Sequence, residues 1–175
     1  MGIQVQQKQS EIENIRPVSI GEIVVSRSSA DILVAYGLGS CVGICAYDPT
    51  VQVGGMLHAL LPTSNNGNNA NNNPAKYVDQ GVELLVESLE KLGAKRNRLI
   101  INMGGGAQML AAPGFNNSLN IGQRNVEAAQ TSLKAAGLRI RAQDTGGHSG
   151  RTLKLYLTDG KVTVKTLGHG EQSLS

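Results

Sequence analysis

One thiol in this sequence stands where it could do nucleophilic chemistry. Cys41 closes the stretch "GLGSC" and is one of two cysteines in 175 residues. A thiol becomes a useful nucleophile when a base takes its proton, and histidine is the commonest such base. The chain offers three histidines, His58, His148 and His169. The fold must therefore bring one of them to Cys41 if the thiol is to react.

A count across a predicted hairpin selects His58. The segments 40–47 and 51–62 flank Asp48 and Pro49, which are typical turn residues, so we expect an antiparallel pair. A turn centred between residues 49 and 50 makes opposite residue numbers sum to 99, as 41 and 58 do. Opposite residues share a sheet face, with Cβ atoms about 4.5 to 5.5 Å apart, a suitable separation for a thiolate and an imidazolium.

The count predicts Cys41 as nucleophile and His58 as general base and acid. It depends on the turn, because Pro49 cannot adopt the positive φ of the favoured two-residue hairpin turns, which favours a longer loop. A shift of the register by two residues keeps both side chains on one face. A shift by one residue places them on opposite faces and removes the pair.

The residues next to Cys41 allow two interpretations. A glycine turn can aim backbone N–H groups at an oxyanion, so Gly39 and Ser40 are candidates for oxyanion or loop support. A loop glycine without that task is equally consistent with the sequence. Cysteine is also among the most buried residue types, and we expect Cys45 to be an inert core thiol.

Other chemistries find little support. The spacing of the two cysteines does not match a usual zinc site, so we expect no metal and no cofactor. The triple glycine 104–106 follows a predicted strand, but it lacks both the Walker ending and the G-x-G-x-x-G spacing of phosphate loops. The segment "GGHSGR" (146–151) resembles an esterase elbow only superficially, because Arg151 replaces its second glycine.

The surrounding elements predict a single layered domain. Alternating and β-branched stretches fill residues 18–62, and an Asn-rich loop follows at 63–74. Apolar residues at helical spacing predict helices over 78–92 and 122–136. Further strands are expected at 98–103, 138–143, 152–157 and 161–167. Elements grouped by type favour an α/β (α+β) domain with mixed or antiparallel sheets over a doubly wound fold.

The ends of the chain and its charge set further expectations. We expect a flexible tail over residues 1–17, a domain over 18–168 and a C-terminal tail over 169–175. The net charge of +3 is spread along the chain and aromatics make up 3%, so nucleic-acid binding is not expected. No apolar run is long enough for a transmembrane segment and no signal-peptide core is present, which predicts a cytoplasmic protein.

At these motifs the sequence resembles a known family, the chemoreceptor glutamine deamidases of bacterial and archaeal chemotaxis, called CheD. The similarity includes "GLGSCVGICAYD" (37–48), "GGMLHALLP" (54–62), "NMGGGAQML" (102–110), "IGQRN" (121–125) and "DTGGHSGR" (144–151). It extends over nearly all of the chain from about Val18, and the segments occur in the family's order and spacing.

The resemblance implies a layered α/β/β sandwich and a protein-glutamine glutaminase. Such an enzyme converts receptor glutamines to glutamate with release of ammonia, using Cys41 and His58. It also implies methyl-accepting chemoreceptors as substrates and a CheC-type phosphatase as partner. A glutamyl methylesterase with the same pair and a binding regulator with weak or no catalysis are the alternatives. One departure stands out: Ala35 occupies the position of a threonine that the family counts as catalytic.

Overall fold

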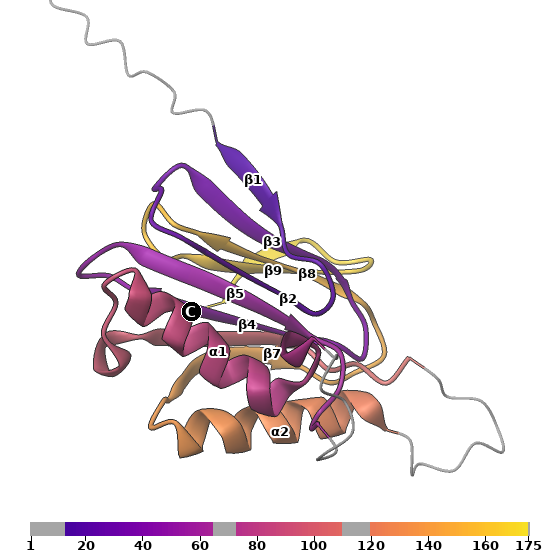
Figure 1. The fold of residues 1–175 in the computed structure, drawn as a ribbon. Helices are drawn as coiled ribbons and strands as arrows, with labels where there is room; N and C mark the ends of the chain where they lie inside the picture. The colour runs from indigo at the N-terminus through magenta and orange to yellow at the C-terminus, as the bar shows by residue number, and fades with distance from the viewer. Residues whose placement is uncertain (1–12, 65–72, 110–119, 175) are drawn as a thin grey trace, which may run out of the picture.

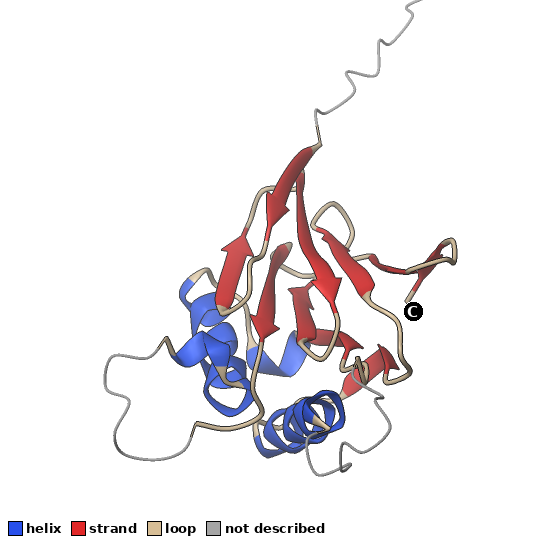
Figure 2. Ribbon diagram, turned by 90° about the vertical axis from the view of Figure 1, so that its right-hand side faces the viewer, coloured by secondary structure: helices blue, strands red, loops and turns tan. Residues whose placement is uncertain are grey.

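The computed structural model describes residues 13–64, 73–109 and 120–174, which form two mixed five-stranded sheets and two α-helices (Figures 1 and 2). The first sheet has the order β1 (Asn14–Pro17), β3 (Asp31–Leu38), β8 (Arg151–Tyr156), β9 (Val162–Thr166) and β10 (Glu171–Ser173). The second sheet has the order β2 (Glu22–Ser26), β5 (Val53–Ala59), β4 (Val42–Asp48), β6 (Ile100–Gly105) and β7 (Ile140–Thr145). The helices are α1 (Val78–Lys91) and α2 (Ile121–Ala135), and two short 3₁₀ helices are η1 (Pro74–Lys76) and η2 (Arg96–Arg98).

These elements stack in three layers, as Figure 1 shows. Both helices cover the outer face of the second sheet, and the first sheet covers its other face. One apolar core, which includes Ile44, Leu57 and Leu85, lies between the helices and the second sheet. Another core, which includes Met56 and Leu153, lies between the two sheets. The predicted α/β/β sandwich with two main helices in a single domain is confirmed.

Strands β4 and β5 are buried along their entire length because they lie inside the second sheet with layers on both sides. Along β4, alternate residues serve different cores: Val42 and Ile44 face the helices, whereas Cys41, just before the strand, and Cys45 face the first sheet. The chain position of Cys41 therefore places its side chain in the layer between the two sheets.

The helices begin and end near the predicted residues. The apolar stripe of α1 is buried, and Gly93 follows its last turn with a φ of 96°. At α2, the Asn120 side chain accepts a hydrogen bond from the Gln123 N–H, and Gly137 follows the helix with a φ of 75°. Glycine ends both helices because it adopts the left-handed conformation without a Cβ clash.

The two chain ends differ from expectation within the described residues. Residues 14–17, expected as part of a flexible tail, form β1 and pair in parallel with β3. Residues 171–173, expected as a C-terminal tail, form β10 against β9. Both short strands are exposed, so backbone pairing rather than an apolar pattern forms them, and sequence periodicity gives no signal for that. The N-terminal residues 1–12 and the Asn-rich residues 65–72 lie outside the described residues.

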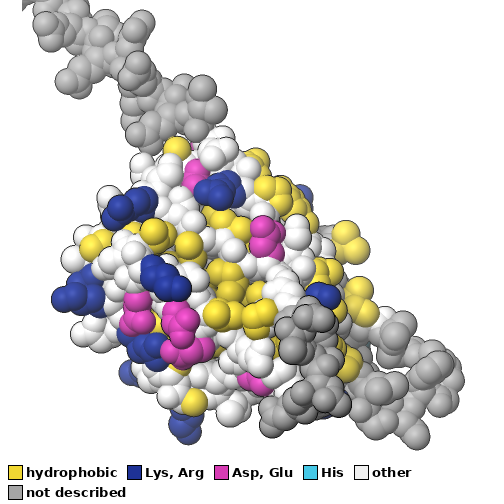
Figure 3. Space-filling model, viewed as in Figure 1, with side chains coloured by type: hydrophobic (Ala, Val, Ile, Leu, Met, Phe, Trp, Pro, Cys, Tyr) yellow, Lys and Arg dark blue, Asp and Glu magenta, His cyan; other side chains and the backbone are white. Residues whose placement is uncertain are grey.

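The surface carries both signs of charge. On the face shown in Figure 3, basic and acidic side chains are interspersed, with apolar side chains between them. Within the part of the chain that the structure describes, no helix combines the length and the hydropathy of a membrane span.

Candidate active site

The β4–β5 hairpin has a register that differs by two residues from the prediction. Asp48 pairs with Val53, and Gly43 pairs with His58, so opposite residue numbers sum to 101 rather than 99. The direct pairing of Cys41 with His58 is therefore wrong. The reason is the turn: residues 49–52 form a four-residue loop, and Gln52 rather than Pro49 takes the positive φ, at 52°.

The two-residue shift keeps Cys41 and His58 on one face. His58 lies opposite Gly43, which is two residues after Cys41, so both side chains point into the layer between the sheets. Gly43 carries no side chain between them, and the side chains of Leu38 and Leu153 pack against it, where a Cβ would press on both. Cys41 is 6% exposed and His58 is 2% exposed.

The His58 ring is held from one side. Its Nδ1 lies 2.9 Å from the backbone oxygen of Val18, which can only accept, so Nδ1 carries the proton and Nε2 has the free lone pair. The Gly21 N–H also donates to the His58 oxygen at 2.7 Å. Among the described residues, Nε2 is buried without a hydrogen-bond partner. The Val18 carbonyl thus fixes a tautomer in which Nε2 can serve as a base, and the Gly21 N–H holds the backbone of His58.

Burial sets the resting charge of both groups. It raises the pKa of the Cys41 thiol, and the residue's own backbone N–H opposes this to a smaller extent. Burial lowers the pKa of His58, and the hydrogen bond with Val18 opposes this to a smaller extent. Both shifts favour a neutral thiol and a neutral imidazole, not the thiolate and imidazolium suggested by the sequence. Among the described residues, no hydrogen bond joins His58 Nε2 to the Cys41 sulfur.

The turn that carries Cys41 is held by its carbonyl groups. The Gly39 oxygen accepts from the Ala107 N–H at 2.8 Å, and the Cys41 oxygen accepts from the Gly106 N–H at 2.7 Å. The Ser40 oxygen accepts from the Asn125 side chain at 2.8 Å. Within the described residues, the N–H groups of positions 39–41 have no backbone acceptor. These bonds hold the turn, and oxyanion or loop support by Gly39 and Ser40 stays a prediction.

The triple glycine has a structural task beside Cys41. Gly105 has a φ of 110°, and a Cβ there would collide with the Cys41 oxygen. Gly106 has a φ of 65°, and a Cβ there would collide with Val126 and crowd the Gly122 oxygen. These glycines let β6 and α2 approach the nucleophile turn. The run of glycines was a sequence signal for this close approach. The sequence showed that the run is not a phosphate loop, but it did not show that the run packs against the Cys41 turn.

Three other features considered from the sequence have different positions in the fold. Ala35 is fully buried on β3, opposite Leu153, and belongs to the same inter-sheet core as Cys41. Arg151 does not form an elbow: it is a buried residue of β8 whose Nε donates to Asp144 at 2.8 Å. No three His, Cys, Asp or Glu side chains in the described ranges converge as metal ligands do.

Fold and site together define an α/β/β sandwich with a buried thiol and imidazole on the face between its sheets. The chain belongs to the CheD family: the family model described as "CheD chemotactic sensory transduction" matches residues 60–166. That match begins just after His58 and contains the triple glycine and α2.

Three relatives, each named "Probable chemoreceptor glutamine deamidase CheD", extend the similarity over the candidate site. The protein of Symbiobacterium thermophilum is 46% identical over 91% of this chain and 97% of its own. That of Caldanaerobacter subterraneus is 46% identical over 87% and 93%. That of the archaeon Thermococcus kodakarensis is 46% identical over 88% and 94%. Among solved structures, YlmD from Geobacillus stearothermophilus aligns over 78% of this chain and 59% of its own, with 11% identity and a TM-score of 0.44, too distant to support an argument.

Proposed function

We propose that this protein is a cysteine hydrolase that deamidates glutamine side chains of chemoreceptors, with Cys41 as nucleophile and His58 as general base and acid. The names of its relatives support the reaction and the substrate. One observation supports the residues: the buried His58 Nε2 has no partner among the described residues and lies on the same sheet face as the Cys41 thiol. A buried polar atom without a partner calls for an explanation, and transfer of the thiol proton supplies one.

The first half of the reaction forms a thioester. His58 Nε2 takes the thiol proton as the Cys41 sulfur attacks the carboxamide carbon of the glutamine, and the carbonyl oxygen becomes an oxyanion. Because burial raises the pKa of the Cys41 thiol and lowers the pKa of His58, we expect the proton to move during the attack rather than before it. His58 then gives that proton to the amide nitrogen, the carbon–nitrogen bond breaks, and ammonia leaves.

The second half returns the enzyme to its starting state. A water molecule gives a proton to His58 Nε2 and attacks the thioester carbon. The carbon–sulfur bond then breaks, and the proton on His58 returns to the Cys41 sulfur. The product is a glutamate side chain. The N–H groups of the Gly39–Cys41 turn, which have no backbone acceptor among the described residues, are suited to stabilise the oxyanion in both halves.

The two cysteines allow a matched test. Wild type, Cys41→Ala and Cys45→Ala are incubated with a purified receptor cytoplasmic fragment, and ammonia release and the conversion of glutamine to glutamate are measured. We expect Cys41→Ala to abolish both. Cys45→Ala removes a thiol of the same inter-sheet core and should keep most of the activity. Wild-type turnover by Cys41→Ala would refute the proposed nucleophile.

The same experiment separates the alternatives. If wild type binds the receptor fragment but releases no ammonia, the chain is a binding regulator. If it releases methanol from a methylated fragment but no ammonia from an unmethylated one, it is a methylesterase that uses the same pair. Binding of a CheC-type phosphatase stays a prediction, and titration calorimetry with the purified phosphatase tests it.

A further inference from the structure

Asn125 is a fully buried side chain with an unusual pair of contacts. It lies on α2, and its Nδ2 donates to the Ser40 oxygen at 2.8 Å and to the Leu60 oxygen at 2.9 Å. Among the described residues, its Oδ1 is buried without any partner. An unpaired polar atom in the interior costs stability, so the two hydrogen bonds that Nδ2 donates call for a functional explanation.

The direction of the Asn125 amide follows from its two partners. Carbonyl oxygens can only accept, so the NH₂ group must face Ser40 and Leu60, and Oδ1 must face away. Both hydrogens of the amide nitrogen are therefore in use. Leucine or alanine at this position would leave two partly buried carbonyl oxygens without their donor, and aspartate would add a negative charge beside them.

The two carbonyl groups belong to the two segments that carry the candidate pair. Ser40 immediately precedes Cys41, and the Ser40 carbonyl shares a peptide plane with the Cys41 N–H. Leu60 follows His58 by two residues, just beyond the end of β5. The first residue of β4 and the last residue of β5, Val42 and Ala59, pair directly, so Asn125 closes the hairpin at the point where strand pairing ends.

We propose that Asn125 is a positioning residue that sets the Cys41 sulfur and its N–H relative to His58. The inference rests on the proposed function for its effect on turnover. Holding the Ser40 carbonyl fixes the opposite side of that peptide, so the Cys41 N–H keeps one direction toward the developing oxyanion. Holding the Leu60 carbonyl fixes the chain that follows His58. Asn125 itself touches neither the substrate nor the reacting atoms.

The test measures turnover and thiol reactivity in Asn125→Ala. We expect kcat to fall about 10- to 100-fold, with KM within about twofold, because orientation rather than binding is lost. Reactivity is measured on the free protein as the rate of Cys41 alkylation by iodoacetamide from pH 5 to 10, followed by mass spectrometry of the Cys41 peptide. We expect the pH at half-maximal rate to rise in Asn125→Ala, because His58 assists removal of the thiol proton less effectively.

Arg98→Ala is the matched control. It destabilises the opposite end of the same hairpin, where Arg98 pairs with the buried Asp48, without touching Ser40 or Leu60. Loss of stability alone would change both variants alike, whereas a positioning role changes kcat and the alkylation profile in Asn125→Ala only. Should Asn125→Ala fail to fold, Asn125→Ser keeps one short donor and is measured in its place.

The outcomes separate the inference from the proposed function. A folded Asn125→Ala or Asn125→Ser variant with kcat and alkylation profile within twofold of wild type overturns the positioning role. If wild type releases no ammonia, the proposed function fails, but the alkylation profiles of free wild type and variant still decide whether Asn125 positions the thiol.

Discussion

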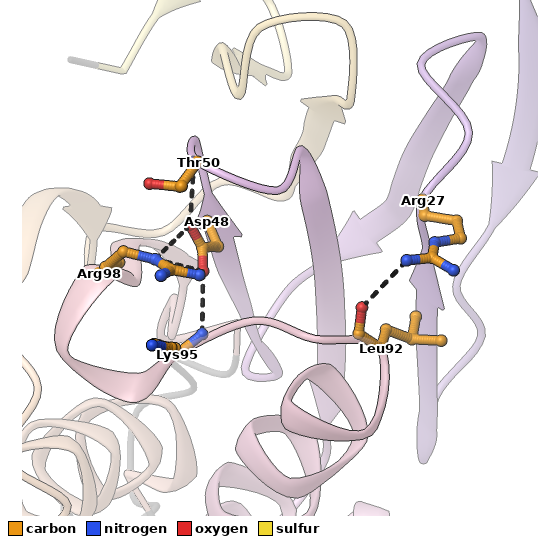
Figure 4. A network of polar contacts seen from close by, with 6 residues as sticks. All are labelled: Arg27, Asp48, Thr50, Leu92, Lys95 and Arg98. Atoms are coloured by element: carbon orange, nitrogen blue, oxygen red, sulfur yellow. Dashed lines mark hydrogen bonds and ion pairs between the residues drawn. The ribbon is translucent and has the colours of Figure 1, made fainter.

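The two ends of the β4–β5 hairpin treat their buried polar groups in opposite ways. At the turn end, Asp48 is fully buried and both its oxygens are occupied: Arg98 donates to both, Thr50 N–H donates to one at 3.0 Å and Lys95 N–H to the other at 2.9 Å (Figure 4). At the opposite end, His58 Nε2 and Asn125 Oδ1 are buried without partners among the described residues.

The difference assigns separate roles to the two ends of this pair of strands: the turn end contributes stability, and the opposite end carries the proposed base. Burial alone would raise the pKa of Asp48, but the hydrogen bonds from Arg98, Lys95 and Thr50 outweigh it and hold the pKa below its usual value. A saturated carboxylate anchors the turn to η2 and cannot easily take part in chemistry. An imidazole with a free lone pair costs stability and is available to accept a proton. Under the proposed function, the hairpin is thus anchored at one end and reactive at the other.

The largest expected effect is at the reactive end. His58→Gln removes the base but keeps a polar side chain of similar reach. We expect kcat for ammonia release to fall about 10²- to 10⁴-fold, the usual contribution of general acid–base catalysis. Steady-state assays with the receptor fragment measure it. Activity close to wild type would mean that some other group takes the proton from Cys41.

The next effect is on stability at the anchored end. Arg98→Ala leaves the buried Asp48 carboxylate without its ion-pair partner, and we expect a loss of about 3 kcal/mol in the free energy of unfolding. Urea denaturation measures this loss. Activity per folded molecule should stay near wild type, and a large fall in kcat would show that the two ends are not independent.

A smaller effect distinguishes the two ends by pH. Because burial lowers the pKa of His58, the unfolded chain binds a proton at this residue more readily than the folded chain does. The folded state should therefore lose stability as the pH falls below 6.5, the ordinary value, and regain it above. His58→Gln should flatten this part of the profile, whereas His148→Gln, which changes an exposed histidine, should retain it. Urea unfolding at a series of pH values checks both.

The smallest effect is expected at Ala35. Restoring the family's threonine by Ala35→Thr adds a hydroxyl to the inter-sheet core. Because the Val18 carbonyl already orients His58, we expect kcat to change by about twofold, far below the roughly 10- to 100-fold typical when a partner that orients a functional histidine is lost. A much larger gain in kcat would indicate that the hydroxyl has a task that the backbone does not perform.

The sequence predicted the fold through patterns that are local. The apolar spacing over 78–92 and 122–136 and the strand expected at 152–157 rest on short-range signals, and the structure has α1, α2 and β8 there. The exposed strands β1 and β10 escaped prediction because their pairing partners are distant in sequence and their own residues show no apolar alternation.

For the candidate site, the sequence predicted which sheet face carries Cys41 and His58, but not which residues pair directly. Alternation decided that Cys41 and His58 share a side, but the register depended on the length of a turn, and Gln52 at a positive φ is not what residue preferences favour. The Val18 carbonyl and the Asn125 amide were not predictable, because a backbone acceptor has no sequence signature and an asparagine in a helix resembles a surface residue.

The hydrogen bond from His58 to Val18 makes the reactive end depend on the edge of the other sheet. Val18 continues directly from β1, and its N–H is held by the Val34 oxygen at 2.8 Å. Strands at an edge fray before a core melts. Val18 itself is buried in the inter-sheet core, so fraying of β1 should loosen its carbonyl before that core melts. On gentle heating we therefore expect turnover to fall reversibly before the circular dichroism changes. A truncation that removes residues 14–17 should therefore lower turnover, although these residues are exposed and lie outside the core.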